Sequence, residues 1–168
     1  MKSFLVAAAL VAGLVSAPAV MAEATQASPL VAHMEDGTAV PLAGFPAGRP
    51  AVVKFWATWC VECRHEMPEL QRMYRRYGDK LSFVLVDIGF NETPAKVAAF
   101  LKQHGYSFPF VFDKNAQLLR AMHVFGTPTH ILLDARGDVI YRAGALDDRL
   151  RAQIASLADG RTGQGGEQ

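Results

Sequence analysis

Apolar runs of strand length alternate along this chain with segments that have helical periodicity. The runs Ala51–Phe55 and Leu81–Ile88 are largely apolar, as expected of strands buried in a sheet. Between them, apolar residues recur at three- and four-residue spacing over Met67–Tyr77, which predicts a helix with one buried face. This strand–helix–strand order predicts a pair of parallel strands.

The second half of the chain continues the alternation. Thr93 and Pro94 are suited to be the N-cap and the first residue of a helix that ends at Gly105. The later predicted elements are, in order, a strand at Phe110–Phe112, a short helix around Leu118–Met122, strands at His130–Leu133 and Val139–Tyr141, and a helix at Leu146–Leu157. The last two strands flank Asp134–Asp138, which predicts a hairpin turn.

An apolar stretch near the N-terminus contains Asp36-Gly37, a dipeptide typical of a two-residue hairpin turn. With this hairpin, the order of elements predicts one α/β domain over residues 30–158, a central mixed sheet flanked by helices on both faces. A chain of 168 residues is long enough for such a domain to bury a sizeable core. The Gly-rich, polar residues 159–168 are expected to be a disordered tail.

Residues 1–22 have the pattern of a signal peptide. A positively charged start and an apolar run precede Val20-Met21-Ala22, which places small or modest side chains at the positions that a signal peptidase recognises. Cleavage after Ala22 would leave residues 23–29 as a linker and would place the domain in the periplasm. The alternative is an uncleaved membrane anchor, because Ser3–Ala22 carries no charge.

The composition fits a globular protein, with 51% hydrophobic and 20% charged residues and a formal net charge of +1. Such an even balance gives no basis for nucleic-acid binding. The chain has 2 cysteines, too few for a disulfide framework or for a structural zinc site made of cysteines alone. We therefore expect neither a bound metal nor a cofactor.

Both cysteines, Cys60 and Cys63, lie where a predicted strand becomes a helix. Cys60 would occupy the helix N-terminus, where unpaired backbone N–H groups and the helix dipole favour a thiolate. We therefore expect Cys60 to be the attacking sulfur in disulfide exchange. Cys63, one turn further on and more buried, would resolve the mixed disulfide.

Cys63 needs a group that takes up its proton. Glu66 is three residues further on, on the same helix face. If this face is turned inward, burial would raise the Glu66 pKa towards neutrality, which suits a general base. The alternative is an ordinary solvated glutamate, since glutamate is seldom fully buried.

The stretch Trp56-Ala57-Thr58-Trp59-Cys60-Val61-Glu62-Cys63, with Glu66 and Pro68, and the later Gly126-Thr127-Pro128-Thr129 resemble the thioredoxin superfamily. The closer resemblance is to the exported TlpA/ResA-like thioredoxins of bacteria, and it runs from Leu30 to Leu157. It implies a thioredoxin fold with an N-terminal β-hairpin and a helical insert around Pro94–Gly105. It also implies an enzyme that catalyses thiol–disulfide exchange.

The resemblance assigns roles to residues around the cysteines. Pro128 would follow a cis peptide bond beside them, and Thr127 would pair its backbone with an extended substrate. Glu66 would take part in proton transfer. Independently of the resemblance, Trp59 adjoins Cys60 and could shield its thiol and contact substrate, or could belong to the core.

Lys54 departs from the pattern, because thioredoxins proper have a buried aspartate six residues before the first cysteine. Lys54 could pair with Glu66 and lower the pKa of both the glutamate and the thiol, or it could extend to the surface. His65 has a spacing conceivable for a Cys/Cys/His metal site, but we expect it on the surface beside Arg64. The remaining histidines share no motif spacing: His33, His104, His123 and His130.

Three functions remain open. The first, implied by the resemblance, is a protein-disulfide reductase that is recharged by a membrane electron carrier of the DsbD/CcdA type. Its clients would be exported proteins with reducible cysteines, such as apocytochrome c or copper-site proteins. The second is a Cu(I)-handling protein that holds the metal on Cys60 and Cys63, since soft thiolates select Cu(I). The third is an oxidant that donates its disulfide, and the reduction potential would distinguish it from the reductase.

Overall fold

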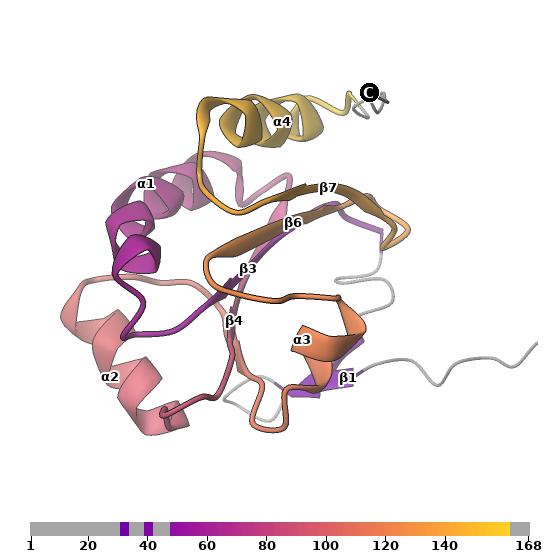
Figure 1. Ribbon diagram of the computed structural model, residues 1–168. Coiled ribbons are helices and arrows are strands. Elements are labelled where there is room, and N and C mark those ends of the chain that lie inside the picture. Colours follow the sequence, from indigo (N-terminus) through magenta and orange to yellow (C-terminus); the bar gives the residue numbers. More distant parts are fainter. Residues whose placement is uncertain (1–30, 34–38, 42–47, 162–168) are drawn as a thin grey trace, which may run out of the picture.

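The computed structural model describes residues 31–33, 39–41 and 48–161, and Figure 1 labels its elements. Its strands are β1 (Val31–His33), β2 (Ala39–Pro41), β3 (Ala51–Trp56), β4 (Ser82–Asp87), β5 (Phe110–Phe112), β6 (Thr129–Leu133) and β7 (Val139–Ala143). Its helices are α1 (Val61–Tyr77), α2 (Pro94–Gln103), α3 (Gln117–Ala121) and α4 (Asp148–Ala158). The predicted signal peptide, the linker, the Asp36-Gly37 turn and residues 162–168 of the predicted tail lie outside the described residues.

Five strands form one mixed sheet in the order β5-β4-β3-β6-β7, and β1 pairs with β2 in a separate antiparallel sheet. β3 is parallel to β4 and antiparallel to β6, so it is the central strand. Helices connect the parallel pairs, α1 between β3 and β4 and α2 between β4 and β5, whereas a short turn joins the antiparallel strands β6 and β7. These observations confirm the predicted mixed sheet, its parallel pair and the N-terminal hairpin.

Helices cover both faces of the sheet, and each strand packs against both layers because its side chains alternate between the faces. Val52 and Trp56 of β3 pack on the face covered by α1, α2 and α4, while Val53 and Phe55 pack on the face covered by α3. Figure 1 shows α3 and α1 on opposite sides of the sheet. Burial of both faces explains why β3 and β4 read as nearly continuous apolar runs.

The predicted helices and strands are present with small differences in their bounds. α1 begins at Val61 with Cys60 as its N-cap, as the position of the cysteine pair predicted, although the apolar repeat starts only at Met67. Its first turn is mostly polar and exposed, and it therefore lacks the apolar repeat that marks the rest of the helix. α2 begins as predicted, with Pro94 first and the Thr93 hydroxyl accepting a hydrogen bond from the Lys96 N–H at 3.2 Å.

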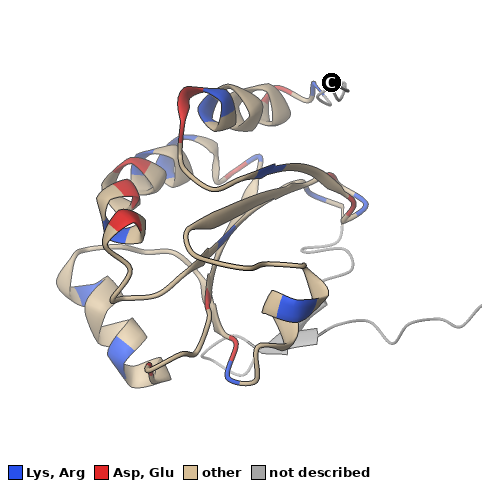
Figure 2. Ribbon diagram, in the orientation of Figure 1, with Lys and Arg blue, Asp and Glu red and all other residues tan. Residues whose placement is uncertain are grey.

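Figure 2 shows the charged residues mainly on the helices and loops, with few on the central strands. β3 and β4 each contain one, Lys54 and Asp87, and both residues are completely buried. Lys54 lies between Val52 and Trp56 on the face of the sheet that α1 covers, and Asp87, the last residue of β4, is level with Trp56 on the same face. In the part of the chain that the structure describes, no helix has the length and apolar character needed to cross a membrane.

Candidate active site

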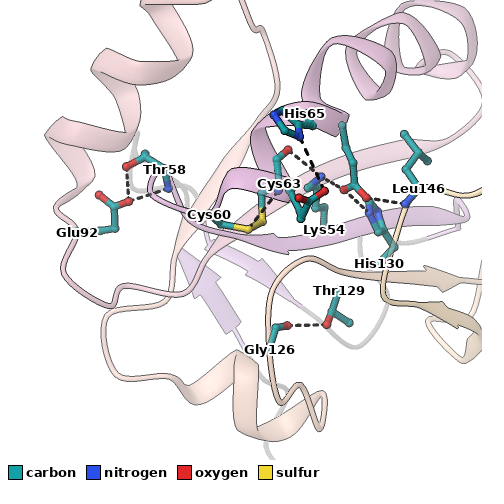
Figure 3. The surroundings of a disulfide bond; sticks show 12 residues. Lys54, Thr58, Cys60, Cys63, His65, Glu92, Gly126, Thr129, His130 and Leu146 are labelled. Carbon is teal, nitrogen blue, oxygen red and sulfur yellow. Dashed lines mark hydrogen bonds and ion pairs between the residues drawn. A yellow bond between two sulfur atoms is a disulfide. The ribbon is translucent and has the colours of Figure 1, made fainter.

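Cys60 and Cys63 form a disulfide across the first turn of α1 (Figure 3), with an S–S distance of 2.04 Å and a Cα–Cα distance of 5.2 Å. Cys60 is the N-cap of the helix, and its sulfur accepts a hydrogen bond from the Cys63 N–H at 3.2 Å. Cys63 is completely buried, whereas 7% of Cys60 is exposed. The more accessible sulfur therefore lies at the positive end of the helix dipole, as expected of an attacking thiolate.

The turn before β6 lies at the edge of the sheet where α1 begins (Figure 3). The Thr127–Pro128 peptide bond is cis, as predicted, and both residues are half-buried. The Thr129 hydroxyl donates a hydrogen bond to the Gly126 carbonyl oxygen at 2.7 Å, which closes the turn. Thr129 also pairs with Phe55 near the end of β3, so strand register holds the turn beside the start of α1.

Glu66 lies on the inner side of α1, at the centre of a buried polar cluster. Its Oε2 atom accepts hydrogen bonds from Lys54 Nζ at 2.5 Å and from His130 Nε2 at 2.9 Å. Its Oε1 atom accepts one from the Leu146 N–H at 2.6 Å. Only 13% of the Glu66 side chain is exposed, so the alternative of an ordinary solvated glutamate is wrong.

Lys54 is completely buried, so the alternative in which it extends to the surface is also wrong. Its ammonium group pairs with Glu66, as the other alternative proposed, and it also donates to the Cys63 carbonyl oxygen at 3.3 Å. Lys54 and His130 are register partners on the neighbouring strands β3 and β6. Directly opposed residues point to the same face, which explains how both side chains reach one carboxylate.

His130 is a site residue to which the sequence pattern gave no role. It shares no motif with the cysteines, and its place beside Lys54 depends on the pairing of β3 with β6. One signal was present, because His130 occupies an inward position of a predicted apolar strand. A polar side chain at such a position needs a hydrogen-bond partner, and Glu66 provides it.

The cluster keeps Glu66 ionised. Burial alone would raise the Glu66 pKa, but hydrogen bonds from His130 and Lys54 outweigh burial and lower the pKa to about 2. The expected rise of this pKa towards neutrality is therefore wrong for the disulfide form. Burial lowers the pKa of both Lys54 and His130, and in each case the Glu66 carboxylate opposes the shift. His130 is thus neutral near neutral pH and donates its Nε2 proton to Glu66.

Asp87, at the end of β4, is a second residue that the motifs did not indicate. It lies beside Trp56 in the parallel register of β3 and β4. Its Oδ1 atom accepts a hydrogen bond from the Gly89 N–H at 2.9 Å, while its Oδ2 atom has no hydrogen-bond partner among the described residues. Burial raises the Asp87 pKa to about 7, so this carboxyl group is partly protonated at neutral pH.

The loop that carries the first cysteine is tied to the start of α2. Glu92 Oε1 accepts hydrogen bonds from the backbone N–H of Thr58 at 2.7 Å and from the Thr58 hydroxyl at 2.5 Å. Lys96 pairs with the same carboxylate at 3.0 Å. Burial would raise the Glu92 pKa, but the bonds from Thr58 and Lys96 hold the pKa below its ordinary value. The carboxylate thereby fixes the loop just before Cys60.

Exposed aromatic side chains occur next to the cysteine pair and next to the cis-proline turn in the chain. Trp59 donates its indole N–H to the Phe90 carbonyl oxygen at 2.8 Å, and the two rings meet edge to face. Trp59 is 44% exposed, Phe90 is 62% exposed, and Phe125, just before the cis-proline turn, is 96% exposed. Trp59 is therefore a surface residue rather than part of the core.

The histidine nearest to the cysteines in sequence lies at the surface, as expected. The His65 side chain is 70% exposed and lies 3.9 Å from the Glu62 carboxylate. Within the described ranges, no three histidine, cysteine, aspartate or glutamate side chains are placed to hold a metal ion.

Comparisons with known proteins agree with this geometry. The model of the AhpC/TSA family matches residues 19–142. The thiol-disulfide oxidoreductase ResA of Bacillus thuringiensis is 32% identical over 105 residues, which is 62% of this chain and 60% of that protein. The thioredoxin-like protein YneN of Bacillus subtilis is 36% identical over 91 residues, 54% of this chain and 53% of that protein. The chain thus spans less than two thirds of the length of these curated relatives.

Solved structures share the fold. A putative thiol:disulfide interchange protein DsbE from Chlorobium tepidum has a TM-score of 0.68 over 79% of this chain and 94% of that chain, with 26% identity. StoA from Bacillus subtilis has a TM-score of 0.64 over 76% of this chain and 96% of that chain, with 23% identity. These likenesses confirm the thioredoxin fold and the similarity to ResA-like proteins. The AhpC/TSA family model matches more than half of this chain, so the chain belongs to that family.

Proposed function

We propose that this protein is an exported thiol–disulfide oxidoreductase that reduces disulfides in client proteins. One observation carries the proposal: the Cys60–Cys63 disulfide caps α1, with Cys60 as the more exposed sulfur and a cis-proline turn at the same edge of the sheet. The names of the relatives support this class of reaction. The two sulfurs supply both electrons, so the exchange needs no further redox group.

The reduced protein begins the proposed reaction with Cys60 as a thiolate. Cys60 attacks one sulfur of the client disulfide, and the other client sulfur leaves as a thiolate and takes up a proton. Cys63 then loses its proton and attacks Cys60, which releases the second client sulfur as a thiolate that is protonated in turn. The client gains two electrons and two protons, and the protein ends with the Cys60–Cys63 disulfide.

The client segment is proposed to lie in an extended conformation along the cis-proline turn. The backbone of Thr127, which precedes Pro128, would pair with this segment in the manner of strand addition. Trp59, Phe90 and Phe125 offer exposed aromatic area to apolar client side chains. A client with apolar residues next to its cysteines fits this surface.

Glu66 belongs to the proposed site as a fixed carboxylate rather than as a general base. An efficient base has a pKa near the working pH, whereas the Glu66 pKa is about 2. Its charge acts on Cys63, which lies one helical turn away on the same face of α1. The Cys63 proton then passes to water or to the departing client thiolate.

The sequence supports a periplasmic location and two kinds of partner. The signal-peptide pattern of residues 1–22 favours export. A reducing dithiol in an oxidising compartment must be recharged, which a membrane carrier of the DsbD/CcdA type would do. The proposed clients are exported proteins with a reducible cysteine pair, such as apocytochrome c before haem attachment or copper-site proteins.

Trapping of client proteins tests this function. Cys63→Ser removes the resolving thiol, so mixed disulfides with client proteins should accumulate through Cys60 and should be released by a reductant. Cys60→Ser is the matched control and should trap no client. Mass spectrometry of the trapped proteins then identifies the clients. Trapping by Cys60→Ser alone would reverse the roles of the cysteines, and trapping by neither variant would contradict the proposal.

A further inference from the structure

A buried cluster of three ionisable side chains lies beside the disulfide (Figure 3). Lys54 and His130 are completely buried, and both bond to the same Glu66 oxygen atom, at 2.5 Å and 2.9 Å. Lys54 also donates to the carbonyl oxygen of Cys63 at 3.3 Å. The cation therefore contacts the residue whose thiol resolves the mixed disulfide in the proposed reaction.

Stability alone does not account for this cluster. Removing a lysine and a glutamate from water is costly, and well-packed apolar residues in place of a buried ion pair are often equally stable or more stable. His130 adds to this cost, because its Nδ1 atom is buried and has no hydrogen-bond partner among the described residues. A functional role explains why charged side chains occupy these inward positions.

We propose that Lys54 and His130 are positioning residues of the disulfide-exchange site. They hold Glu66 as a carboxylate, and the opposing charges of Lys54 and Glu66 together set how readily the Cys63 thiol ionises. This inference rests on the proposed exchange at the two cysteines and adds to it a charge pair that acts as a unit.

The two charges act on Cys63 in opposite directions. A cation close to a thiol favours the thiolate and an anion disfavours it, by roughly one to three pKa units for charges within about 4–6 Å. The two charges belong to side chains on different elements, Lys54 on β3 and Glu66 on α1, and a single substitution removes either one. His130 carries no charge near neutral pH and acts through Glu66, since its Nε2 proton orients the carboxylate.

Other titratable groups surround the cluster. Asp147, just before α4, raises the pKa of His130, and Asp87 lies at the end of β4. Glu62 and His65 flank Cys63 on the exposed side of α1. Glu62→Gln is the matched control for Glu66→Gln, because it removes a glutamate charge one helical turn earlier and leaves the hydrogen bonds of the cluster intact.

The experiment measures the pKa of the Cys63 thiol in a Cys60→Ser background, from the ultraviolet absorbance of the thiolate as a function of pH. Lys54→Met should raise this pKa by about one unit or more, and Glu66→Gln should lower it by a similar amount. The double variant, Lys54→Met with Glu66→Gln, should return close to the parent value. Glu62→Gln should shift the pKa less than either single variant, because its charge is exposed to solvent.

Two results would overturn the inference: shifts of the same sign in the Lys54 and Glu66 variants, or shifts no larger than that of Glu62→Gln. If Lys54→Met does not fold, carbon NMR of the Glu66 carboxyl group supplies the test. His130→Leu should raise the Glu66 pKa, and His130→Gln, which keeps an N–H donor, should raise it less. If the Glu66 pKa is the same in both His130 variants and in the wild type, the proposed role of His130 is contradicted.

The proposed function can be contradicted without contradicting this inference. A wild-type protein that exchanges with no client disulfide, while the thiol pKa shifts as expected, would contradict the function and leave the charge pair established.

Discussion

At the scale of single residues, the carboxyl group of Asp87 links the stability of the protein to pH. Burial raises its pKa to about 7, whereas an aspartate in an unfolded chain titrates near 4. Over the interval between these values the native state binds a proton that the unfolded state has lost, so stability falls as pH rises. The contribution of Asp87 is complete below about pH 4 and is lost progressively up to about pH 7.

Asp87→Asn should remove this pH dependence, because asparagine has a similar size and keeps an acceptor for the Gly89 N–H. Urea unfolding measures the difference between the free energies of unfolding of the variant and the wild type. This difference should shift in favour of the variant by on the order of 4 kcal/mol between about pH 4 and pH 7. Asp79→Asn, at an exposed position, is the control and should follow the wild type. Parallel curves of stability against pH for Asp87→Asn and the wild type would contradict the raised pKa.

Short motifs predicted that the two cysteines and Glu66 belong to the site, and the resemblance to thioredoxins implied the cis bond before Pro128. The sequence could not predict that His130 bonds to Glu66, because 64 residues separate them and only the β3–β6 register brings them together. Whether Lys54 pairs or extends to the surface also depends on β3 being the central strand. The expectation that burial raises the Glu66 pKa is wrong for the same reason, since partners from three other segments determine it. The alternative in which pairing with Lys54 lowers this pKa is confirmed.

At the scale of elements, α3 shows how one side chain can start a helix. It has 5 residues, and isolated helices of this length are unstable in water. Its N-cap residue, Ala116, makes no side-chain capping bond. Instead, the buried carboxylate of Asp113 accepts hydrogen bonds from the backbone N–H groups of the first three helical residues, at 2.8, 3.2 and 2.9 Å.

Asp113→Ala should lower the free energy of unfolding by about 2–3 kcal/mol, because three backbone N–H groups lose their acceptor. Asp113→Asn, which keeps one oxygen acceptor, should lie between this variant and the wild type. Lys114→Ala, at the neighbouring exposed position, should have little effect. Urea unfolding of the four proteins at one pH makes the comparison. An unchanged midpoint for Asp113→Ala would show that α3 does not depend on this carboxylate.

Periodicity predicted the buried part of each helix, because it reports the side chains that face the core. It failed at the first turn of α1, where exposed polar residues surround the buried Cys63. It also ended the last strand too early, since β7 continues to Ala143, which pairs with His130. The start of α1 is set locally, because the Cys60 sulfur accepts a hydrogen bond from the Cys63 N–H, whereas the end of β7 depends on its pairing with β6.

At the scale of the whole molecule, the fold brings the reacting groups to one edge of the sheet. The parallel strands β3 and β4 end at this edge, and the antiparallel strand β6 begins there (Figure 1). Both cysteines pack in the same hydrophobic cluster as buried residues of α1, α2 and α4. The redox state of the pair is therefore coupled to the stability of the domain.

A reductant should be more stable as the disulfide than as the dithiol. By thermodynamic linkage, the free energy of unfolding of the disulfide form then exceeds that of the dithiol form. The excess is about 1.4 kcal/mol for each 30 mV by which the reduction potential of the folded protein lies below that of the unfolded chain. Urea unfolding with and without a reductant measures this difference, and a Cys60→Ser/Cys63→Ser protein controls for the reductant itself. Greater stability of the dithiol form would contradict the reductase and support the oxidant.

The positions of the tryptophans add an optical property to the site. The chain has 2 tryptophans, Trp56 and Trp59, and both lie within the few residues before Cys60. Trp56 is completely buried, and Trp59 is partly exposed and held by its bond to Phe90. Indole fluorescence responds to local polarity and is quenched by a nearby disulfide. Tryptophan emission, selected by excitation at wavelengths that tyrosine does not absorb, therefore comes only from the neighbourhood of the cysteine pair, and it can follow oxidation, reduction and client docking without a label.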